Sequence, residues 1–240
     1  MSSKLERKQA AAEAALESIR KGCRLGLGCG STVNEFIRLL GEKVRRGFSV
    51  RAIAACTQSE AVAREAGVPL EESSEDLFPL DVLVDGADEV DIRMRLIKGG
   101  GGALLHEKVL AFSTYKFIVI AEGEKLVDEL GKFPLPVEVA PFGFAGTLKR
   151  IRKEAARVGC VGDIALRRDG KGKVFVSDAG HWICDCAFGN IPDPESLSIR
   201  LDNIAGVMGH GLFLRLASVV LLGKEDGVMV LGDSDGLILR

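Results

Sequence analysis

Hydrophobic positions in the first half of the chain follow two alternating patterns. Short apolar runs have the length of buried strands, and they are found at 23–27, 50–56, 80–84 and 116–121. Between them, apolar residues recur every three or four positions, as in 33–44, which predicts amphipathic helices. A capping box of Ser3 and Glu6 predicts one more helix, ending before Gly22. Strands that alternate with helices predict an α/β fold with a mostly parallel, Rossmann-like sheet and helices on both faces.

The pattern changes near Pro134, where this alternation stops. The elements predicted next are a helix, three strands and a helix, at 144–158, 160–166, 173–177, 182–187 and 192–204. They predict a smaller α+β (ferredoxin-like) domain. Residues 211–239 again show strand pairs, which we expect to return to the first sheet. The predicted domains are a catalytic α/β domain, 1–133 with 207–240, and a smaller domain, 134–206.

Composition and charge narrow the class of protein. With 240 residues, 47% hydrophobic and 28% charged, the chain is that of an ordinary globular protein. The net charge of −2 and the dispersed lysines and arginines disfavour nucleic acid or a membrane as the main partner. No signal peptide is visible, and the most apolar run, 211–223, contains Arg215 and is too short to span a bilayer. We expect a soluble, cytoplasmic protein.

The six cysteines are too few for a disulfide scaffold. Cys184 and Cys186 are two positions apart, so on a strand they share a face, but no second close pair exists and His181 is the only histidine nearby. Small buried core residues are therefore favoured over zinc ligands, and no metal is expected.

Three polar, glycine-rich segments, 28–32, 85–91 and 98–102, are expected at the carboxyl ends of strands, where open α/β sheets bind ligands. The first does not fit the dinucleotide fingerprint, because Ser31 and Val33 stand where a glycine is required. It is suited instead to hold a phosphate through backbone N–H groups and hydroxyls at a helix N-terminus. An inert turn is the alternative.

Four carboxylates lie within the second segment, at Asp85, Asp88, Glu89 and Asp91. A solvated loop and a magnesium site are two interpretations, although the spacing does not match a calcium loop. The third interpretation is that these carboxylates accept hydrogen bonds from sugar hydroxyls or move their protons. The cluster by itself does not decide between the three.

The third segment combines four glycines with Lys98 before them and Glu107 after them. If a helix begins near Gly102, its N–H groups and Lys98 can stabilise an oxygen that acquires negative charge. Glu107 then lies within the first two turns, where it can take a proton from a carbon beside a carbonyl. A base with an oxyanion site is the equipment for enolisation; the alternative is a surface Glu–Lys pair after a flexible loop.

Four stretches of this sequence, VDGADEVD, IKGGGGALLHEK, GLGCGSTV and GKFPLPVEV, resemble the signature segments of the ribose-5-phosphate isomerase type A family. The resemblance implies an aldose–ketose isomerase of the non-oxidative pentose phosphate pathway, which interconverts D-ribose 5-phosphate and D-ribulose 5-phosphate through an enediolate. It also implies no cofactor, neither metal nor nucleotide, and a homodimer or homotetramer.

The resemblance assigns roles to individual residues. Glu107 is the base, Lys98 and the glycines after it hold the charged oxygen, and Asp85 and Asp88 bind hydroxyls and assist ring opening. The implied substrate-binding residues are Lys8, Cys29, Gly30, Ser31, Thr32, Asp85, Gly86, Ala87, Asp88, Lys98, Gly99, Gly100, Gly101 and Lys132.

The sequence departs from the family at Cys29, which stands where threonine is usual, and at the segment 56–59. A thiol at a helix N-terminus has a lowered pKa, so we expect Cys29 to be reactive and to compete with the phosphate. The alternative is a buried, inert thiol. Two other classes of protein remain open: a sugar-phosphate sensor without catalysis and a coenzyme A transferase-like enzyme.

Overall fold

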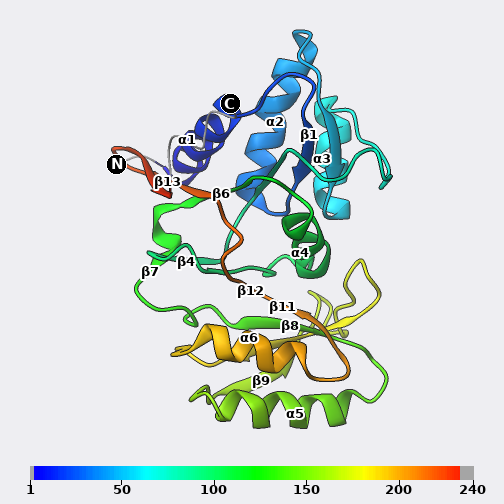
Figure 1. Cartoon of the computed structure of the whole chain (residues 1–240), viewed down its shortest axis with the longest axis vertical. Helices are drawn as coiled ribbons and strands as arrows, with labels where there is room; N and C mark the ends of the chain where they lie inside the picture. The colour runs from blue at the N-terminus through cyan, green and yellow to red at the C-terminus, as the bar shows by residue number, and fades with distance from the viewer. Residues whose placement is uncertain (1–2, 233–240) are drawn as a thin grey trace. The chain divides into compact units, whose positions relative to one another are not determined.

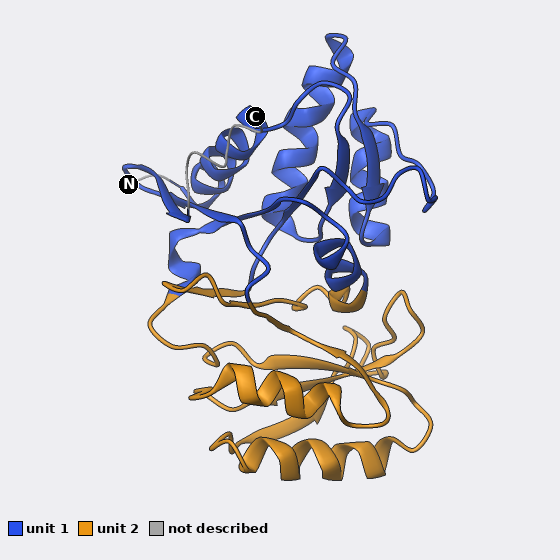
Figure 2. Cartoon of the chain, in the orientation of Figure 1, with its two compact units in different colours: residues 1–87, 106–126, 215–240 blue, residues 88–105, 127–214 orange. Residues whose placement is uncertain are grey.

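The computed structural model describes residues 3–232 of the chain, which divides into two units. Unit 1 comprises residues 1–87, 106–126 and 215–240, and unit 2 comprises 88–105 and 127–214, drawn blue and orange in Figure 2. Of the predicted catalytic domain, segments 88–105, 127–133 and 207–214 thus group with unit 2. The functional domain boundaries expected from the sequence stay a prediction.

Unit 1 contains a six-stranded sheet in the order β14-β13-β6-β3-β1-β2 (Figure 1). All neighbouring strands are parallel except β13 and β14, which form an antiparallel hairpin. The strands are β1 (Arg24–Leu27), β2 (Arg51–Ala54), β3 (Val82–Asp85), β6 (Phe117–Glu122), β13 (Val219–Lys224) and β14 (Gly227–Gly232). The mostly parallel sheet is as predicted, and the chain after 211 does return to it; residues 233–239 of that prediction lie outside the described residues.

The helices of unit 1 are α1 (Lys4–Glu17), α2 (Ser31–Arg45) and α3 (Thr57–Ala66), followed by α4 (Leu104–Phe112), whose first two residues are counted in unit 2. The predicted capping box is present: Ser3 and Glu6 exchange side-chain-to-backbone hydrogen bonds. Apolar residues of α1–α3 pack with alternate residues of the sheet strands into one core. Because alternate residues of a strand point to the same face of the sheet, these contacts place the three helices on one side of the sheet.

Unit 2 contains an antiparallel sheet in the order β11-β8-β10-β9, with helices α5 (Phe144–Ala156) and α6 (Pro194–Asp202) lying side by side (Figure 1). Its strands are β8 (Leu135–Val139), β9 (Asp163–Leu166), β10 (Trp182–Ala187) and β11 (Val207–His210). Cys184 and Cys186 are fully buried in its core, as the spacing indicated. The α+β class is confirmed.

A small sheet of short strands completes the description, in the order β12-β5-β4-β7. These strands are β4 (Glu89–Asp91), β5 (Leu96–Ile97), β7 (Leu126–Val127) and β12 (Leu212–Phe213), with a 3₁₀ turn, η1 (Gly123–Lys125), before β7. The segment 98–102 was expected after a strand of the parallel sheet. That expectation is wrong, because Lys98 follows β5, which pairs antiparallel with β4 and β12.

Two strand predictions also differ from the structure. Residues 173–177 form only isolated bridges, Val174 with Arg168 and Val176 with Trp182, because tight turns at 169–172 and 177–180 reverse the chain on either side of the segment. Strand β8 was not predicted, since Pro134 and Pro136 make the stretch look like a linker. Its five residues are nevertheless buried between β10 and β11. Among residues 3–232, no helix has the length and apolar character needed to cross a membrane.

Candidate active site

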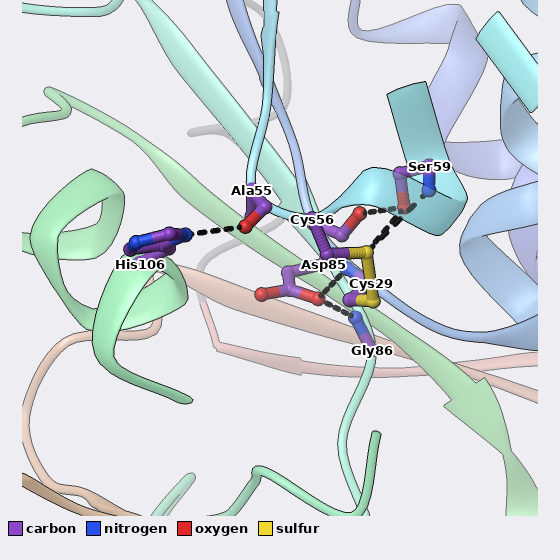
Figure 3. The surroundings of a disulfide bond; sticks show 8 residues. Cys29, Ala55, Cys56, Ser59, Asp85, Gly86 and His106 are labelled. Carbon is purple, nitrogen blue, oxygen red and sulfur yellow. Dashed lines mark hydrogen bonds between the residues drawn. A yellow bond between two sulfur atoms is a disulfide. The ribbon is translucent and has the colours of Figure 1, made fainter. Parts of the chain in front are cut away.

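Asp85 is the last residue of β3 and is completely buried. Its Oδ1 accepts hydrogen bonds from the backbone N–H groups of Cys29, at 2.9 Å, and Gly86, at 2.7 Å (Figure 3). A Cβ atom on Gly28 would lie 1.9 Å from Asp85 Cγ, so only glycine allows this approach. The first two predicted segments, 28–32 and 85–91, are thereby joined at the carboxyl ends of β1 and β3.

The loop after β1 leads directly into α2. Gly30 is the N-cap residue of α2, with φ of 123°, and it offers no side chain to the N–H groups of the first turn. Lys8 of α1 donates to Ser31 Oγ at 2.8 Å. This contact places a positive charge beside an uncapped helix N-terminus; the binding of substrate by Lys8 stays a prediction.

Glu122, at the end of β6, is the counter-charge of this region. Its carboxylate accepts a hydrogen bond from the Thr32 hydroxyl at 3.2 Å and lies 3.5 and 3.7 Å from the ammonium groups of Lys4 and Lys8. Burial acts to raise the pKa of Glu122, but hydrogen bonds to it and the two lysines outweigh burial and hold the pKa below its ordinary value. Glu122 is therefore an anchor for Thr32 and Lys8.

Cys29 is joined to Cys56 by a disulfide bond (Figure 3). The expectation of a reactive Cys29 thiol is therefore wrong, because a disulfide sulfur has no proton to lose. Cys29 has no partner close by in the sequence: the two cysteines are 27 positions apart and come together only because β1 and β2 are neighbouring parallel strands. Segment 56–59, the second departure from the family, supplies the partner.

Glu107 lies in the first turn of α4 and is 3% exposed. Burial of a carboxylate is costly unless the surroundings support it, and such side chains concentrate at functional sites. The preceding residue, His106, places its Nδ1 3.1 Å from the carbonyl oxygen of Ala55, beyond the end of β2 (Figure 3). In unit 1, α4 begins at His106. This hydrogen bond therefore holds that end of the helix, and with it Glu107, near the carboxyl ends of the parallel strands.

Lys98, in unit 2, is buried to the same degree, with 2% of its surface exposed. Its ammonium nitrogen lies 5.5 Å from the centre of the Phe213 ring, and its backbone N–H donates to the carbonyl of Gly211 at 2.9 Å. A buried lysine held in this way keeps few alternative rotamers. It is therefore suited to stabilise a negative charge at a defined position.

Asp88 holds the glycine loop of unit 2. Its Oδ2 accepts a hydrogen bond from the Gly100 N–H at 2.7 Å, and a Cβ on Gly100 would lie 2.5 Å from Asp88 Oδ1. Gly99 and Gly102 have positive φ angles, 100° and 88°, which side chains rarely adopt. Three of the four consecutive glycines are thus required by contact or by backbone conformation.

Arg167, which follows β9 (Asp163–Leu166), contacts this loop and was not predicted from the sequence. Its guanidinium donates to the carbonyls of Gly99 and Gly100, at 3.0 and 3.2 Å, and forms a two-point ion pair with Asp185 of β10. It also lies 5.7 Å from the centre of the Phe175 ring. Only the pairing of β9 with β10 brings these groups together, so no local pattern in the sequence indicates them.

The remaining members of the acidic cluster have structural partners. Glu89 accepts hydrogen bonds from the backbone N–H groups of Gly131 and Phe133, on either side of the exposed Lys132. Asp91 accepts bonds from the backbone of Arg93 and Arg95 and pairs with the Arg95 guanidinium. Across residues 3–232 the structure groups no three His, Cys, Asp or Glu side chains as metal ligands.

The structure therefore places the predicted residues in two sets. Unit 1 joins Asp85 and Gly86 to Cys29 and holds Ser31, Thr32 and Lys8 together, and it also contains Glu107. Unit 2 joins Asp88 to Gly100 and contains Lys98. A parallel α/β sheet with a buried carboxylate, a buried lysine and loops built for close approach defines an α/β enzyme.

Comparison with known sequences identifies the enzyme family. The family model for ribose 5-phosphate isomerase A (phosphoriboisomerase A) matches residues 51–227, and the chain belongs to this family. Ribose-5-phosphate isomerase A of Rhizobium meliloti is 48% identical over 221 residues, which cover 92% of this chain and 95% of that protein. The family resemblance of the four sequence motifs is therefore confirmed.

Solved structures agree over nearly the whole length. A D-ribose-5-phosphate isomerase in complex with phospho-erythronic acid matches with a TM-score of 0.87 and 37% identity, covering 97% of this chain and 100% of that one. The ribose 5-phosphate isomerase from Plasmodium falciparum matches with a TM-score of 0.89 and 30% identity, covering 97% and 100%. The fold is thus shared with enzymes that are as long as this chain.

Proposed function

We propose that this protein is an aldose–ketose isomerase that interconverts D-ribose 5-phosphate and D-ribulose 5-phosphate in the non-oxidative pentose phosphate pathway. The observation that carries the proposal is Glu107, a carboxylate 3% exposed in the first turn of the helix that follows the glycine loop. Family membership supports the substrate, and the related structure with phospho-erythronic acid supports a phosphorylated sugar acid as ligand.

In the proposed reaction, Glu107 takes the proton from C2 of the open-chain aldose. The C–H electron pair forms the C1–C2 double bond, and the carbonyl oxygen on C1 becomes negatively charged. Glu107 then returns the proton to C1 while the hydroxyl proton on O2 passes to O1, which leaves a carbonyl at C2. Lys98 and the N–H groups of Gly99 and Gly101 stabilise the enediolate oxygen, while the Gly100 N–H holds Asp88.

The other assignments concern binding. The sugar hydroxyls are assigned to residues 85–88, which are Asp85, Gly86, Ala87 and Asp88. The two aspartates also assist ring opening. The phosphate is assigned to the loop residues Cys29, Gly30, Ser31 and Thr32. Two observations support this assignment: the N-terminus of α2 is uncapped, and the positive charge of Lys8 lies beside Ser31. Lys132, which is exposed, is a further substrate contact.

We also propose a homodimer or homotetramer that acts in the cytoplasm. Large apolar side chains exposed at the end of α4 and just beyond it support association: Val109, Phe112 and Tyr115 are 53%, 72% and 71% exposed. Burial of such a surface is favourable, and the partner here is a second copy of the chain.

The test is an assay of ribulose 5-phosphate formed from ribose 5-phosphate, with EDTA present throughout. Steady turnover that requires no added metal supports the proposal. Glu107→Gln, purified in parallel, is the control for contaminating isomerase. Absence of ketose formation, with ribose 5-phosphate still bound, would favour a sensor; acyl exchange between coenzyme A esters would favour the transferase.

A further inference from the structure

The Cys29–Cys56 disulfide joins two loops that follow neighbouring parallel strands (Figure 3). Cys29 is in the loop after β1 that we assign to the phosphate, and Cys56 is the N-cap residue of α3. Their Cα atoms are 6.2 Å apart, within the range that a disulfide spans. The bond therefore ties a proposed substrate loop to a second element of the same unit.

Hydrogen bonds from Ser59 and to Asp85 hold the backbone around the disulfide. The Ser59 hydroxyl donates to the carbonyl of Gly28 at 2.5 Å, and the Ser59 N–H lies 3.4 Å from Cys56 Sγ. Beyond the bridge, the Cys29 N–H donates to Asp85 Oδ1. The conformation of residues 28–30 thus has several supports, of which the disulfide is the covalent one.

The chain distinguishes this pair from its other cysteines. Cys23, Cys160, Cys184 and Cys186 are free and buried. Burial raises the thiol pKa of Cys23, Cys160 and Cys184 to about 11, and that of Cys186 is also raised by burial. These thiols stay protonated near neutral pH and react slowly. Cys29 is half-buried and therefore more accessible than Cys56, which is 8% exposed.

We infer that Cys29–Cys56 is a redox modification site, reduced by a dithiol, whose oxidised form binds the sugar phosphate more tightly. This inference rests on the proposed function, because it takes 29–32 as a substrate loop. In the oxidised protein the loop is ordered before binding. In the reduced protein part of that ordering must occur on binding, which weakens affinity.

The exchange is a two-electron reduction. A thiolate of the dithiol attacks Cys29 Sγ, the sulfur–sulfur bond breaks, and Cys56 leaves as a thiolate that takes up a proton. The second thiol of the reductant then attacks the mixed disulfide and releases Cys29 as a thiol. The reductant leaves as a cyclic disulfide, and both cysteines become thiols.

The effect is expected on KM and not on kcat. The hydrogen bonds around the disulfide run to Gly28, Ser59 and Asp85 (Figure 3), whereas we assign the proton transfer to Glu107 and the enediolate oxygen to Lys98. The cost of ordering one loop side chain on binding corresponds to a change in affinity of about 2- to 10-fold. We therefore expect reduction to raise KM by about this factor.

The experiment compares the full-length protein before and after treatment with dithiothreitol. Ketopentose is measured directly, so that no coupling enzyme is exposed to the reductant. Cys56→Ser imitates the reduced state and keeps Cys29; Cys160→Ser, which removes a buried free thiol of unit 2, is the matched control. Iodoacetamide labelling with mass-spectrometric mapping reports the state of each cysteine.

We expect dithiothreitol to raise KM in the wild-type protein and in Cys160→Ser, with kcat unchanged. Cys56→Ser should have the higher KM with or without reductant, and Cys29 and Cys56 should label in the wild type only after reduction. An unchanged KM with full turnover, or labelling of Cys29 without reductant, would overturn the redox inference alone. The wild-type comparison decides even where Cys56→Ser fails to fold. Loss of isomerisation in both redox states would instead refute the proposed function.

Discussion

Arg167 and Asp185 form a two-point ion pair, with Nε to Oδ2 at 2.9 Å and Nη2 to Oδ1 at 2.5 Å. The third guanidinium nitrogen, Nη1, donates to the carbonyls of Gly99 and Gly100. In a planar trans peptide the carbonyl and the next N–H point in opposite directions. Arg167 therefore orients the N–H of Gly100, which donates to Asp88, and the N–H of Gly101, which we assign to the enediolate oxygen.

The first prediction follows from this geometry. Arg167→Ala should lower kcat/KM by roughly 10- to 100-fold, the effect of a catalytic loop displaced by a fraction of an ångström to an ångström. Arg167→Lys should not restore it, since one ammonium group cannot match both the carboxylate and the two carbonyls. The control is Arg168→Ala, since Arg168 donates to the carbonyl of Gly172 in the neighbouring turn.

Steady-state kinetics of the three variants provide the measurement. A kcat that falls in Arg167→Ala while the affinity for ribose 5-phosphate stays near the wild-type value would indicate that the loop is mispositioned. Equal kinetics for Arg167→Ala and Arg168→Ala would show that the orientation of these carbonyls does not matter for turnover.

Glu107→Gln tests the base. The amide keeps the size of the buried side chain but cannot accept a proton from carbon, so kcat should fall by roughly 10²- to 10⁴-fold. Affinity for ribose 5-phosphate, measured by calorimetry, should remain close to that of the wild type. The control is Glu124→Gln, an exposed glutamate at the protein surface. A Glu107→Gln variant that retained most of its kcat would exclude Glu107 as the base.

Lys98→Met tests the oxyanion site. Methionine occupies a similar volume beside Phe213 without the charge. Phospho-erythronic acid carries a carboxylate where the enediolate carries its charged oxygen, so the wild-type protein should bind it more tightly than ribose 5-phosphate. Lys98→Met should abolish most of that difference in calorimetric titrations. Equal affinity of the wild-type protein for the two ligands would count against an oxyanion site.

Glu122 predicts a pH dependence of stability. Its pKa is lowered in the folded protein, so its ionised form stabilises the fold above the pKa of the unfolded chain, close to the ordinary 4.5. This contribution is lost as the pH falls through the lower pKa of the folded state. Glu122→Gln should therefore be less stable than the wild type at neutral pH, with a difference that shrinks as the pH falls through the lowered pKa of the folded state.

Urea unfolding of both proteins across this pH range measures the effect on the free energy of unfolding. Glu124→Gln serves again as the surface control. A difference between wild type and Glu122→Gln that stayed constant with pH would mean that the charge of Glu122 does not contribute through Lys4 and Lys8.

The sequence by itself determined most elements of the fold and the motifs from which we assign the site. Helix and strand periods depend on neighbouring residues, so the parallel sheet, the capping box at Ser3 and the glycine loops were all predictable. Glu107 and Lys98 were recognisable as candidate site residues, because a carboxylate, a cation and a glycine run within ten residues form a local pattern.

The tertiary structure decided which distant segments meet. Cys29 faces Cys56 because β1 pairs with β2, and Arg167 reaches Asp185 because β9 pairs with β10. The same reason explains β8, whose prolines argue against a strand until its neighbours on both sides are known. Such pairings are set by the summed burial and hydrogen bonding of many residues far apart in the chain. A short stretch of sequence does not include these distant residues, so it does not predict which strands pair.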